Sequence, residues 1–227
     1  MIVGNGMIAR LFNEFSLPDG ILIHASGVSD SSCLSQADFE RDTSLLSKSI
    51  KSGKKIIYFS SQACGDVGLP SPYIEHKLRL ESMIFENSRE HIVLRIPQVA
   101  SQYGNRNNLL NSFHDSLLWT GSVICFSNIK RNLIKDIHLK SAVEFVLKNN
   151  LDGLLYFCSP FDFTPTEIAL AMKEMLNMNG TIEIKELERE CNRFLCSDEF
   201  AVIREKMFGI DRDQYIRDII KHAFKTK

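Results

Sequence analysis

Short apolar runs alternate with longer stretches that carry apolar residues on one helical face, and this alternation extends over most of the chain. The short runs predict strands and the longer stretches predict helices. Side chains return to the same face about every 2 residues in a strand and about every 3.6 residues in a helix. Strands are expected at residues 2–3, 21–25, 56–59, 92–96, 123–126, 154–157 and 182–184. Helices are expected at residues 7–15, 37–52, 73–88, 108–119, 138–149, 197–206 and 211–224 and from residue 164 onward.

The order of these elements predicts the fold class. Strands rich in β-branched residues that alternate with helices form mostly parallel sheets covered by helices on both faces. We therefore expect an α/β protein with residues 1–227 in a single domain. Thr164 and Pro165 suit the N-cap and the first position of a helix.

Composition narrows the class of partner. The chain has 227 residues, 44% of them apolar, which is enough to bury a core in one domain. Its 27 lysines and arginines nearly balance 28 aspartates and glutamates, so we expect neither a nucleic-acid partner nor a membrane surface. No apolar run is long enough to span a membrane, and Met1–Gly4 do not begin a secretory leader, so we expect a cytoplasmic protein.

The six cysteines are scattered and form no Cys-x-x-Cys pair. Cys191 and Cys196 lie five residues apart, without a further cysteine or histidine at a zinc-like spacing. Several cysteines lie inside apolar runs. We therefore expect buried, reduced thiols and no metal site.

A glycine motif follows the first predicted strand. Gly4, Gly6 and Ala9 form the pattern Gly-x-Gly-x-x-Ala at a strand-to-helix turn. In dinucleotide-binding folds the first glycine allows a tight turn, the second admits the pyrophosphate close to the backbone, and the small third residue lets helix and strand pack. The same pattern also suits a purely structural turn.

Two further motifs carry acid–base chemistry. Tyr73 and Lys77 are four residues apart at the start of a predicted helix, so they share one face. A nearby ammonium favours the phenolate and lowers a tyrosine pKa, which makes such a pair a general acid or base. Ser60 and Ser61 lie at the carboxyl end of the third predicted strand, where ligand sites of α/β sheets gather. A hydroxyl there can donate to an oxygen that gains charge.

In this order the motifs resemble those of the extended short-chain dehydrogenase/reductases, the NAD-dependent epimerase/dehydratase family of nucleotide-sugar enzymes. The resemblance covers nearly the whole chain and is sharpest over residues 56–97. The segments that carry it are Ile21-Leu22-Ile23-His24-Ala25-Ser26-Gly27, Phe59-Ser60-Ser61, Ser71-Pro72-Tyr73-Ile74-Glu75-His76-Lys77 with Leu78 and Glu81, Leu94-Arg95-Ile96-Pro97-Gln98-Val99, Arg131-Asn132-Leu133-Ile134 and residues 163–175.

The resemblance implies NAD or NADP as cofactor and a nucleotide-sugar as substrate. Tyr73 would be the acid/base, and Lys77 would hold the nicotinamide ribose and lower the Tyr73 pKa. Ser61 would bind the reacting oxygen, with Ser60 as its rival. Arg131 is a candidate contact to the substrate phosphates and is equally compatible with a solvated surface arginine. The residues implied to bind the cofactor are Gly4, Gly6, Met7, Ile8, Ala9, Ala25, Ser26, Gly27, Ser60, Lys77 and Pro97.

The interval from Gly4 to His24 departs from the family pattern. It has room for one helix and one strand, whereas a full nucleotide fold adds a strand, a helix and a strand there and an acidic residue for the adenosine ribose. We expect a reduced Rossmann-like sheet that lacks the second and third strands, with the first strand at the edge. A small substrate-binding part is expected from residues 100–135 and 160–227.

Several side chains near these motifs keep more than one interpretation. Gln62 and Ala63 stand where the dehydratase branch carries an Asp-Glu pair, which disfavours a dehydratase. His76 and His114 suit a second acid or base as well as surface or packing roles, and Cys64 suits an epimerase acid as well as a loop thiol. His138 stands near the position where the family often has an acid.

The sequence thus predicts an NAD(P)-dependent sugar-nucleotide oxidoreductase or epimerase, which reduces a keto-sugar or inverts a carbinol centre through a ketone. The alternative is a non-catalytic relative that binds a nucleotide-sugar or a protein partner. A homodimer that covers the edge strand is a further possibility.

Overall fold

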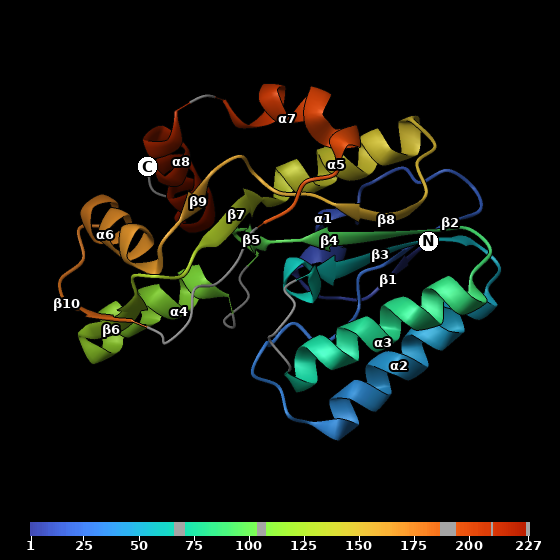
Figure 1. Ribbon diagram of the computed structural model, residues 1–227, viewed down its shortest axis with the longest axis horizontal. Coiled ribbons are helices and arrows are strands. Elements are labelled where there is room, and N and C mark those ends of the chain that lie inside the picture. The colour runs from blue at the N-terminus through green and yellow to red at the C-terminus, as the bar shows by residue number, and fades with distance from the viewer. Residues whose placement is uncertain (66–70, 104–107, 187–193, 210, 226–227) are drawn as a thin grey trace. The chain divides into compact units, whose positions relative to one another are not determined.

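The computed structural model describes residues 1–65, 71–103, 108–186, 194–209 and 211–225 (Figure 1). The chain divides into two compact units. The first joins Met1–Ile96 to Lys140–Phe157, and the second joins Pro97–Leu139 to Cys158–Lys227. The segments expected to bind substrate, 100–135 and 160–227, fall in the second unit, and that role stays a prediction, as does the single-domain organisation.

The first unit is built on a parallel sheet of five strands. Its strands in spatial order are β1 (Ile2–Val3), β2 (Ile21–His24), β3 (Lys55–Ser61), β4 (His91–Ile96) and β8 (Gly153–Tyr156). Each neighbouring pair is parallel. The predicted α/β class and its mostly parallel, Rossmann-like sheet are confirmed.

Helices cover both faces of this sheet, as the alternation along β3 requires. Tyr58 points to one face, where it joins a buried cluster with Leu46, Leu80 and Ile84. Phe59 points to the other face, where its ring stacks on Phe12 with centroids 5.8 Å apart. The helices of this unit are α1 (Met7–Leu11), α2 (Gln36–Lys51), α3 (Pro72–Asn87) and the part of α5 (Asp136–Lys148) from Lys140 onward. Figure 1 shows α2 and α3 running side by side, and residues of the two helices contact each other.

β1 lies at the edge of the sheet, as predicted. Between β1 and β2, where every residue is described, the chain forms one helix and no strand. That helix, α1, ends at Leu11 instead of continuing to residue 15, because the chain turns at residues 12–14. The interpretation of this arrangement as a shortened form of the family's fold stays a prediction.

The described residues of the second unit contain two small sheets. One holds β5 (Gln98–Ala100), β7 (Arg131–Lys135) and β9 (Asp162–Phe163), and the other pairs β6 (Ser122–Phe126) with β10 (Thr181–Lys185) in parallel. Its helices are α4 (Leu109–Asp115), α6 (Pro165–Met175), α7 (Ala201–Phe208) and α8 (Arg212–Phe224), and α4 continues into a π-helical turn over Ser116–Thr120 instead of as a regular helix. No helix among the described residues is long and apolar enough to cross a membrane.

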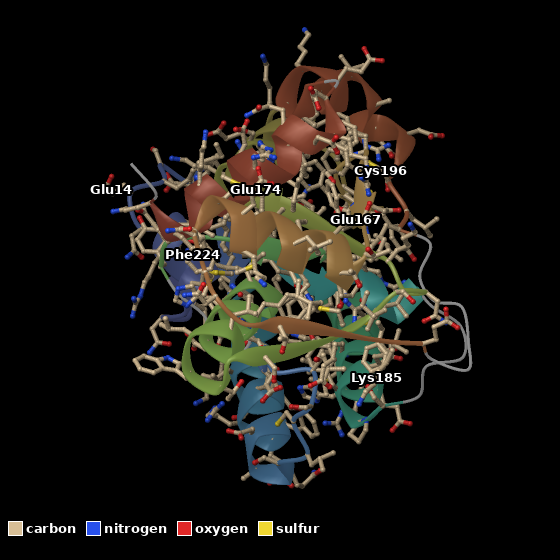
Figure 2. The ribbon with its side chains drawn as sticks, turned by 90° about the vertical axis from the view of Figure 1, so that its left-hand side faces the viewer. Glu14, Glu167, Glu174, Lys185, Cys196 and Phe224 are labelled. Carbon is tan, nitrogen blue, oxygen red and sulfur yellow. The ribbon has the colours of Figure 1, made fainter. Side chains whose placement is uncertain are left out.

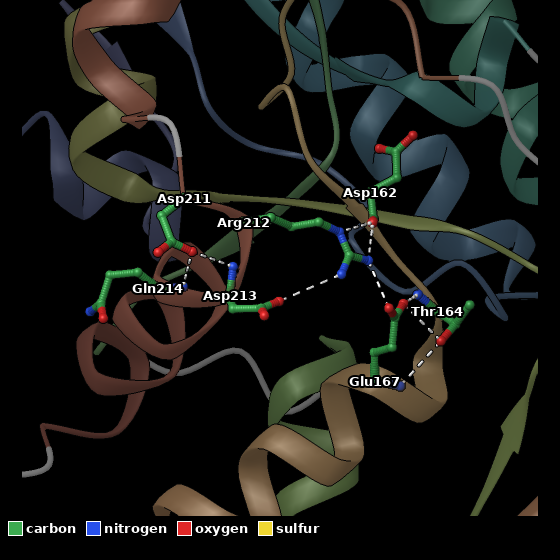
Figure 3. Close-up of polar contacts among 7 residues, drawn as sticks. All are labelled: Asp162, Thr164, Glu167, Asp211, Arg212, Asp213 and Gln214. Atoms are coloured by element: carbon green, nitrogen blue, oxygen red, sulfur yellow. Dashed lines mark hydrogen bonds and ion pairs between the residues drawn. The ribbon is translucent and has the colours of Figure 1, made fainter.

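The start of α6 is capped by Thr164, as the sequence indicated, together with Glu167. The Thr164 hydroxyl accepts a hydrogen bond from the Glu167 N–H at 3.2 Å, and the Glu167 carboxylate accepts one from the Thr164 N–H at 2.6 Å. Arg212, at the start of α8, donates to the same carboxylate at 2.8 Å and to the Asp162 carbonyl at 2.7 Å (Figure 3). One arginine therefore joins α8 to α6 and β9 within this unit.

His24 makes the stability of the first unit depend on pH. It is fully buried, its Nδ1 lies 2.8 Å from the Ser49 hydroxyl, and burial lowers its pKa to about 4. The unfolded chain takes up a proton near pH 6.5, whereas the folded chain stays neutral, so stability is full above that pH and falls as the pH drops toward 4. We expect His24 to contribute a loss of about 2 kcal/mol between pH 7.5 and pH 5.

Urea unfolding of the wild type, His24→Gln and His114→Gln at the two pH values tests this prediction. His24→Gln should reduce the difference between the two pH values, whatever its effect on stability at pH 7.5. His114→Gln should keep the difference, because the His114 side chain is 31% exposed. An unchanged difference in His24→Gln would contradict the assignment.

Candidate active site

The hydroxyls of Ser61 and Tyr73 meet at the carboxyl end of β3. Ser61 is the last residue of that strand, and Tyr73 lies in the first turn of α3. Ser71 caps this helix, with its hydroxyl accepting the Ile74 N–H at 3.2 Å, and Pro72 follows at the first position, where its missing N–H costs nothing. The Ser61 side chain is close enough to the Tyr73 hydroxyl to influence its pKa, so the two predicted catalytic hydroxyls lie near each other.

The pKa of Tyr73 departs from the sequence-based expectation. Burial raises it to about 12, and the nearby Ser61 side chain offsets only part of this increase. The expected lowering by Lys77 is wrong for this structure. The Lys77 ammonium lies 5.9 Å from the centroid of the Tyr73 ring and donates instead to the Tyr58 hydroxyl at 3.1 Å. Tyr73 is therefore a protonated phenol at neutral pH.

Lys77 lies in a buried charged cluster with Asp42 and His76. An added side-chain carbon on Gly27 would lie 3.1 Å from the Asp42 carboxylate and 3.3 Å from the Lys77 ammonium, so both groups line the same glycine. The Asp42 carboxylate accepts the Val28 N–H at 3.1 Å and contacts His76 Nε2 at 2.9 Å. Burial lowers the Lys77 pKa, and the negative charge of Asp42 opposes this effect.

Asp42 is the member of this cluster that the sequence analysis missed. It lies on the buried face of α2 with Phe39, Leu46 and Ser49. A carboxylate within the apolar stripe of an amphipathic helix is rarely found without a buried partner. That pattern could have singled out Asp42, although it does not say which cation lies opposite.

Ser60 belongs to a second buried network next to the Ser61–Tyr73 pair. Its hydroxyl donates to Glu81 at 2.5 Å, and Glu81 receives two hydrogen bonds from Arg95, at 2.9 and 2.5 Å. Arg95 also donates to the Tyr156 hydroxyl at 2.5 Å. Because the Ser60 hydroxyl is bound to Glu81, the geometry favours Ser61 over Ser60 as the serine that meets a reacting oxygen. A cofactor contact through Ser60 stays a prediction.

The two glycines after β1 have different environments. Gly4 has a φ of 127°, and a side-chain carbon there would lie 2.5 Å from the Ala25 carbonyl oxygen and 2.8 Å from the Ser26 nitrogen. Gly6 is the N-cap of α1, and a side-chain carbon added to Gly6 would have no neighbouring atom within 4 Å. The fold therefore requires glycine at position 4, whereas glycine at position 6 leaves open space that a ligand can approach. Ala9 is buried, as the motif requires.

These environments predict different outcomes for two matched substitutions. Gly4→Ala should destabilise the protein by about 2–4 kcal/mol, because it combines a strained backbone angle with a clash against backbone atoms. Gly6→Ala should change the free energy of unfolding by less than about 1 kcal/mol. Urea unfolding measures both values, and a larger loss for Gly6→Ala than for Gly4→Ala would contradict this account of the turn.

The remaining candidates have structural surroundings of their own. Met7 and Ile8 lie in α1, while Pro97 and Arg131 belong to the second unit, with Arg131 half-buried at the start of β7. Their predicted contacts to cofactor and substrate stay predictions.

The other titratable candidates take packing positions. Burial lowers the pKa of His138 to about 3, and its ring packs 4.5 Å from that of Phe208. His114 stacks on Phe224 at 4.9 Å. Burial raises the pKa of Cys64, which keeps it a thiol at neutral pH. Within the described ranges, no group of three or more His, Cys, Asp and Glu side chains could hold a metal ion.

The fold of this chain is similar to that of several solved structures. dTDP-4-dehydrorhamnose reductase from Bacillus anthracis, in complex with NADP, matches with a TM-score of 0.72 and 16% identity over 100% of this chain and 98% of that chain. UDP-glucose 4-epimerase from Thermus thermophilus, in complex with NAD, matches with a TM-score of 0.67 and 14% identity over 95% and 80% of the two chains.

UDP-N-acetylglucosamine 4-epimerase from Methanobrevibacter ruminantium, in complex with UDP-N-acetylmuramic acid, matches with a TM-score of 0.66 and 14% identity over 90% and 76%. No protein-family model and no curated protein matches the chain. The predicted resemblance to the extended short-chain dehydrogenase/reductases is confirmed at the level of the fold. These coverages do not confirm the expected loss of two strands.

Proposed function

We propose that this chain, which has the fold of the extended short-chain dehydrogenase/reductases, is an NAD(P)-dependent enzyme that reduces or epimerises nucleotide-linked sugars. Its structural neighbours include a reductase solved with NADP and epimerases solved with NAD or a nucleotide-sugar. Among the reactions of this kind, we favour reduction of a keto-sugar. The observation that carries this choice is the adjacent pair of Ser61 and Tyr73 hydroxyls with a protonated phenol.

In this proposal each hydroxyl has one task. A ketone that becomes an alcohol gains negative charge on its oxygen as hydride arrives at carbon, and NADH or NADPH supplies that hydride when it is bound. Ser61 donates a hydrogen bond to the oxygen, and Tyr73 transfers its proton to it. A phenol with a pKa of about 12 holds its proton at neutral pH, so it is prepared for the acid role that reduction needs.

The residues around this pair fit a nicotinamide cofactor. Gly6 leaves open space at the turn after β1, which suits the close approach of a pyrophosphate. Gly27, with a φ of 147°, is lined by the Lys77 ammonium. An ammonium has three donors, so Lys77 keeps donors for ribose hydroxyls besides the bond to Tyr58. Whether NAD or NADP is preferred is part of the experiment.

Calorimetric titration of the purified full chain with NADH and NADPH is the first test, followed by turnover of either with nucleotide-linked keto-sugars. We expect saturable binding of at least one nucleotide and oxidation of it that depends on the keto-sugar. Binding without turnover of any keto-sugar, together with interconversion of sugar epimers, would replace reduction by epimerisation. No binding of either nucleotide would overturn the enzymatic proposal.

A non-catalytic nucleotide-sugar-binding protein is the second candidate. The observation in its favour is that the Lys77 ammonium donates to the Tyr58 hydroxyl and not to the Tyr73 hydroxyl. The same calorimetry with nucleotide-sugars discriminates the two, because this candidate predicts sugar-nucleotide binding without nicotinamide binding. A homodimer through the β1 edge is a further part of the proposal, and sedimentation at micromolar concentration tests it.

A further inference from the structure

Ser61, the proposed donor to the substrate oxygen, lies between two residues whose side chains are buried. Ser60 is 4% exposed and Gln62 is 6% exposed, whereas Ser61 is partly exposed. β3 ends at Ser61, and its pairing with β4 ends at the same residue. The backbone hydrogen bonds of the sheet therefore hold the chain up to Ser61, and other contacts must hold the turn that follows.

Gln62 provides such contacts beyond the end of the strand. Its side-chain amide donates to the carbonyl oxygens of Arg95, in β4, and Phe157, directly after β8, with both N–O distances at 3.3 Å. The Phe157 N–H donates to the same Arg95 carbonyl at 3.1 Å. An amide has two N–H donors and a carbonyl oxygen has two lone pairs, so all three hydrogen bonds can form together. Gln62 thereby joins the turn after β3 to the next two strands of the sheet.

The same turn orients the Ser61 hydroxyl. Gln62–Gly65 form one turn of 3-10 helix, and the N–H of Ala63 in this turn donates to the Ser61 hydroxyl oxygen at 3.2 Å. An oxygen that accepts this bond has its hydroxyl hydrogen directed away from Ala63, where it stays available as a donor. The position of the turn therefore sets the direction in which Ser61 can donate, and the Gln62 side chain fixes the turn to the sheet.

We propose that Gln62 is a positioning residue that holds the Ser61 hydroxyl, through the turn at Ala63, in the direction of the oxygen that gains charge. This inference rests on the proposed function, which gives Ser61 the role of donor. A donor stabilises a developing charge best when its direction is fixed beforehand, because no reorganisation is then needed during the reaction. Gln62 itself is buried with its amide bound to strand carbonyls, so it acts through Ser61 and contacts neither substrate nor cofactor.

Gln62→Met is the first test, because methionine keeps most of the side-chain volume and has no N–H donor. We expect kcat for keto-sugar reduction to fall by about 10- to 100-fold, since small displacements of a positioned group cost up to about 100-fold. KM for the keto-sugar and Kd for NADH or NADPH should stay within about threefold of the wild type. Gln36→Met is the matched control. The Gln36 amide donates to the exposed Glu40 carboxylate at 3.0 Å, so kcat should change by less than about twofold.

Hydrogen exchange of the Ala63 N–H, followed by NMR, gives a second readout that needs no turnover. Gln62→Met and Ser61→Ala should both speed this exchange by about fivefold or more, because they loosen or remove the hydrogen bond that the N–H makes. The N–H of Ile57, in the middle of β3, should keep its exchange rate, which would show that the sheet is intact. Gln36→Met should leave both rates unchanged.

The two readouts separate this inference from the proposed function. An unchanged kcat in Gln62→Met beside an active wild type, or an unchanged exchange rate at Ala63, would overturn the positioning role alone. Faster exchange at Ala63 and Ile57 together would indicate a general loosening of the sheet and would also overturn it. A wild type that turns over no keto-sugar would overturn the proposed function, whereas faster exchange at Ala63 alone in Gln62→Met would still support the hold of Gln62 on Ser61.

Discussion

Tyr73→Phe is expected to lower kcat for keto-sugar reduction by about 10²- to 10⁴-fold, the range found when a positioned acid is removed. The substitution deletes the phenolic hydroxyl that lies near Ser61 and leaves the ring in place. The affinity for NADPH or NADH should change by less than about threefold, because the proposal assigns the hydroxyl to the substrate oxygen and not to the cofactor. Steady-state kinetics and calorimetry on the same preparation measure the two quantities.

Tyr103→Phe is the matched control for that substitution. Tyr103 is 43% exposed and belongs to the second unit, so removal of its hydroxyl should leave kcat within about twofold of the wild type. Equal kcat values for Tyr73→Phe and the wild type would remove Tyr73 from the chemistry. Equal losses in both variants would instead indicate a general effect of the substitution on the protein.

The largest effect on stability is expected for Glu81→Ala. Glu81 and Arg95 form a two-point ion pair whose side chains are 3% and 9% exposed, and Ser60 donates to the same carboxylate. Removal of one partner leaves an uncompensated buried charge, so we expect the free energy of unfolding to fall by about 3–5 kcal/mol. Urea unfolding with a common slope for wild type and variant gives the value.

Glu174→Ala removes a similar pair at the surface and serves as the control. The Glu174 and Arg217 side chains are 64% and 43% exposed, and their N–O distance is 2.8 Å (Figure 2). The loss in the free energy of unfolding should therefore stay within about 1 kcal/mol. The double variant Glu81→Leu with Arg95→Met should recover part of the Glu81→Ala loss, because it removes both charges together. If Glu81→Ala lowers the free energy of unfolding by less than Glu174→Ala does, the buried pair does not stabilise the fold.

The elements of the first unit were predictable to within a few residues because its strands are apolar on both faces and its helices have an apolar stripe. β3, for example, is buried over Ile56–Ser60, and its residues 56–59 form one continuous apolar run. In the second unit β5, β7 and β9 were missed. β5 and β9 are only three and two residues long, and β7 carries the buried polar residue Asn132, whose amide donates to the Ser159 and Phe161 carbonyls.

The candidate site was predictable where the chemistry is local in sequence. The serine at the end of β3 and the tyrosine in the first turn of α3 follow from a strand end and a helix start, and the structure brings Ser61 and Tyr73 together. The groups around Lys77 were not predictable. Tyr58 has the sequence context of an ordinary core residue of β3, and Asp42 lies 35 residues before the lysine. Contacts of this kind depend on how α2, α3 and β3 pack.

The strand order of the first sheet also bears on how the chain folds. β1, β2, β3 and β4 lie side by side in the order in which they occur in sequence, so each new strand pairs with the one made just before it. Such an arrangement keeps the sequence separation of contacts low for a parallel sheet, which favours fast folding. β8 pairs with β4 although a long stretch of chain separates the two strands. We therefore expect residues 1–96 to collapse first, from the amino end, and β8 to complete the sheet last.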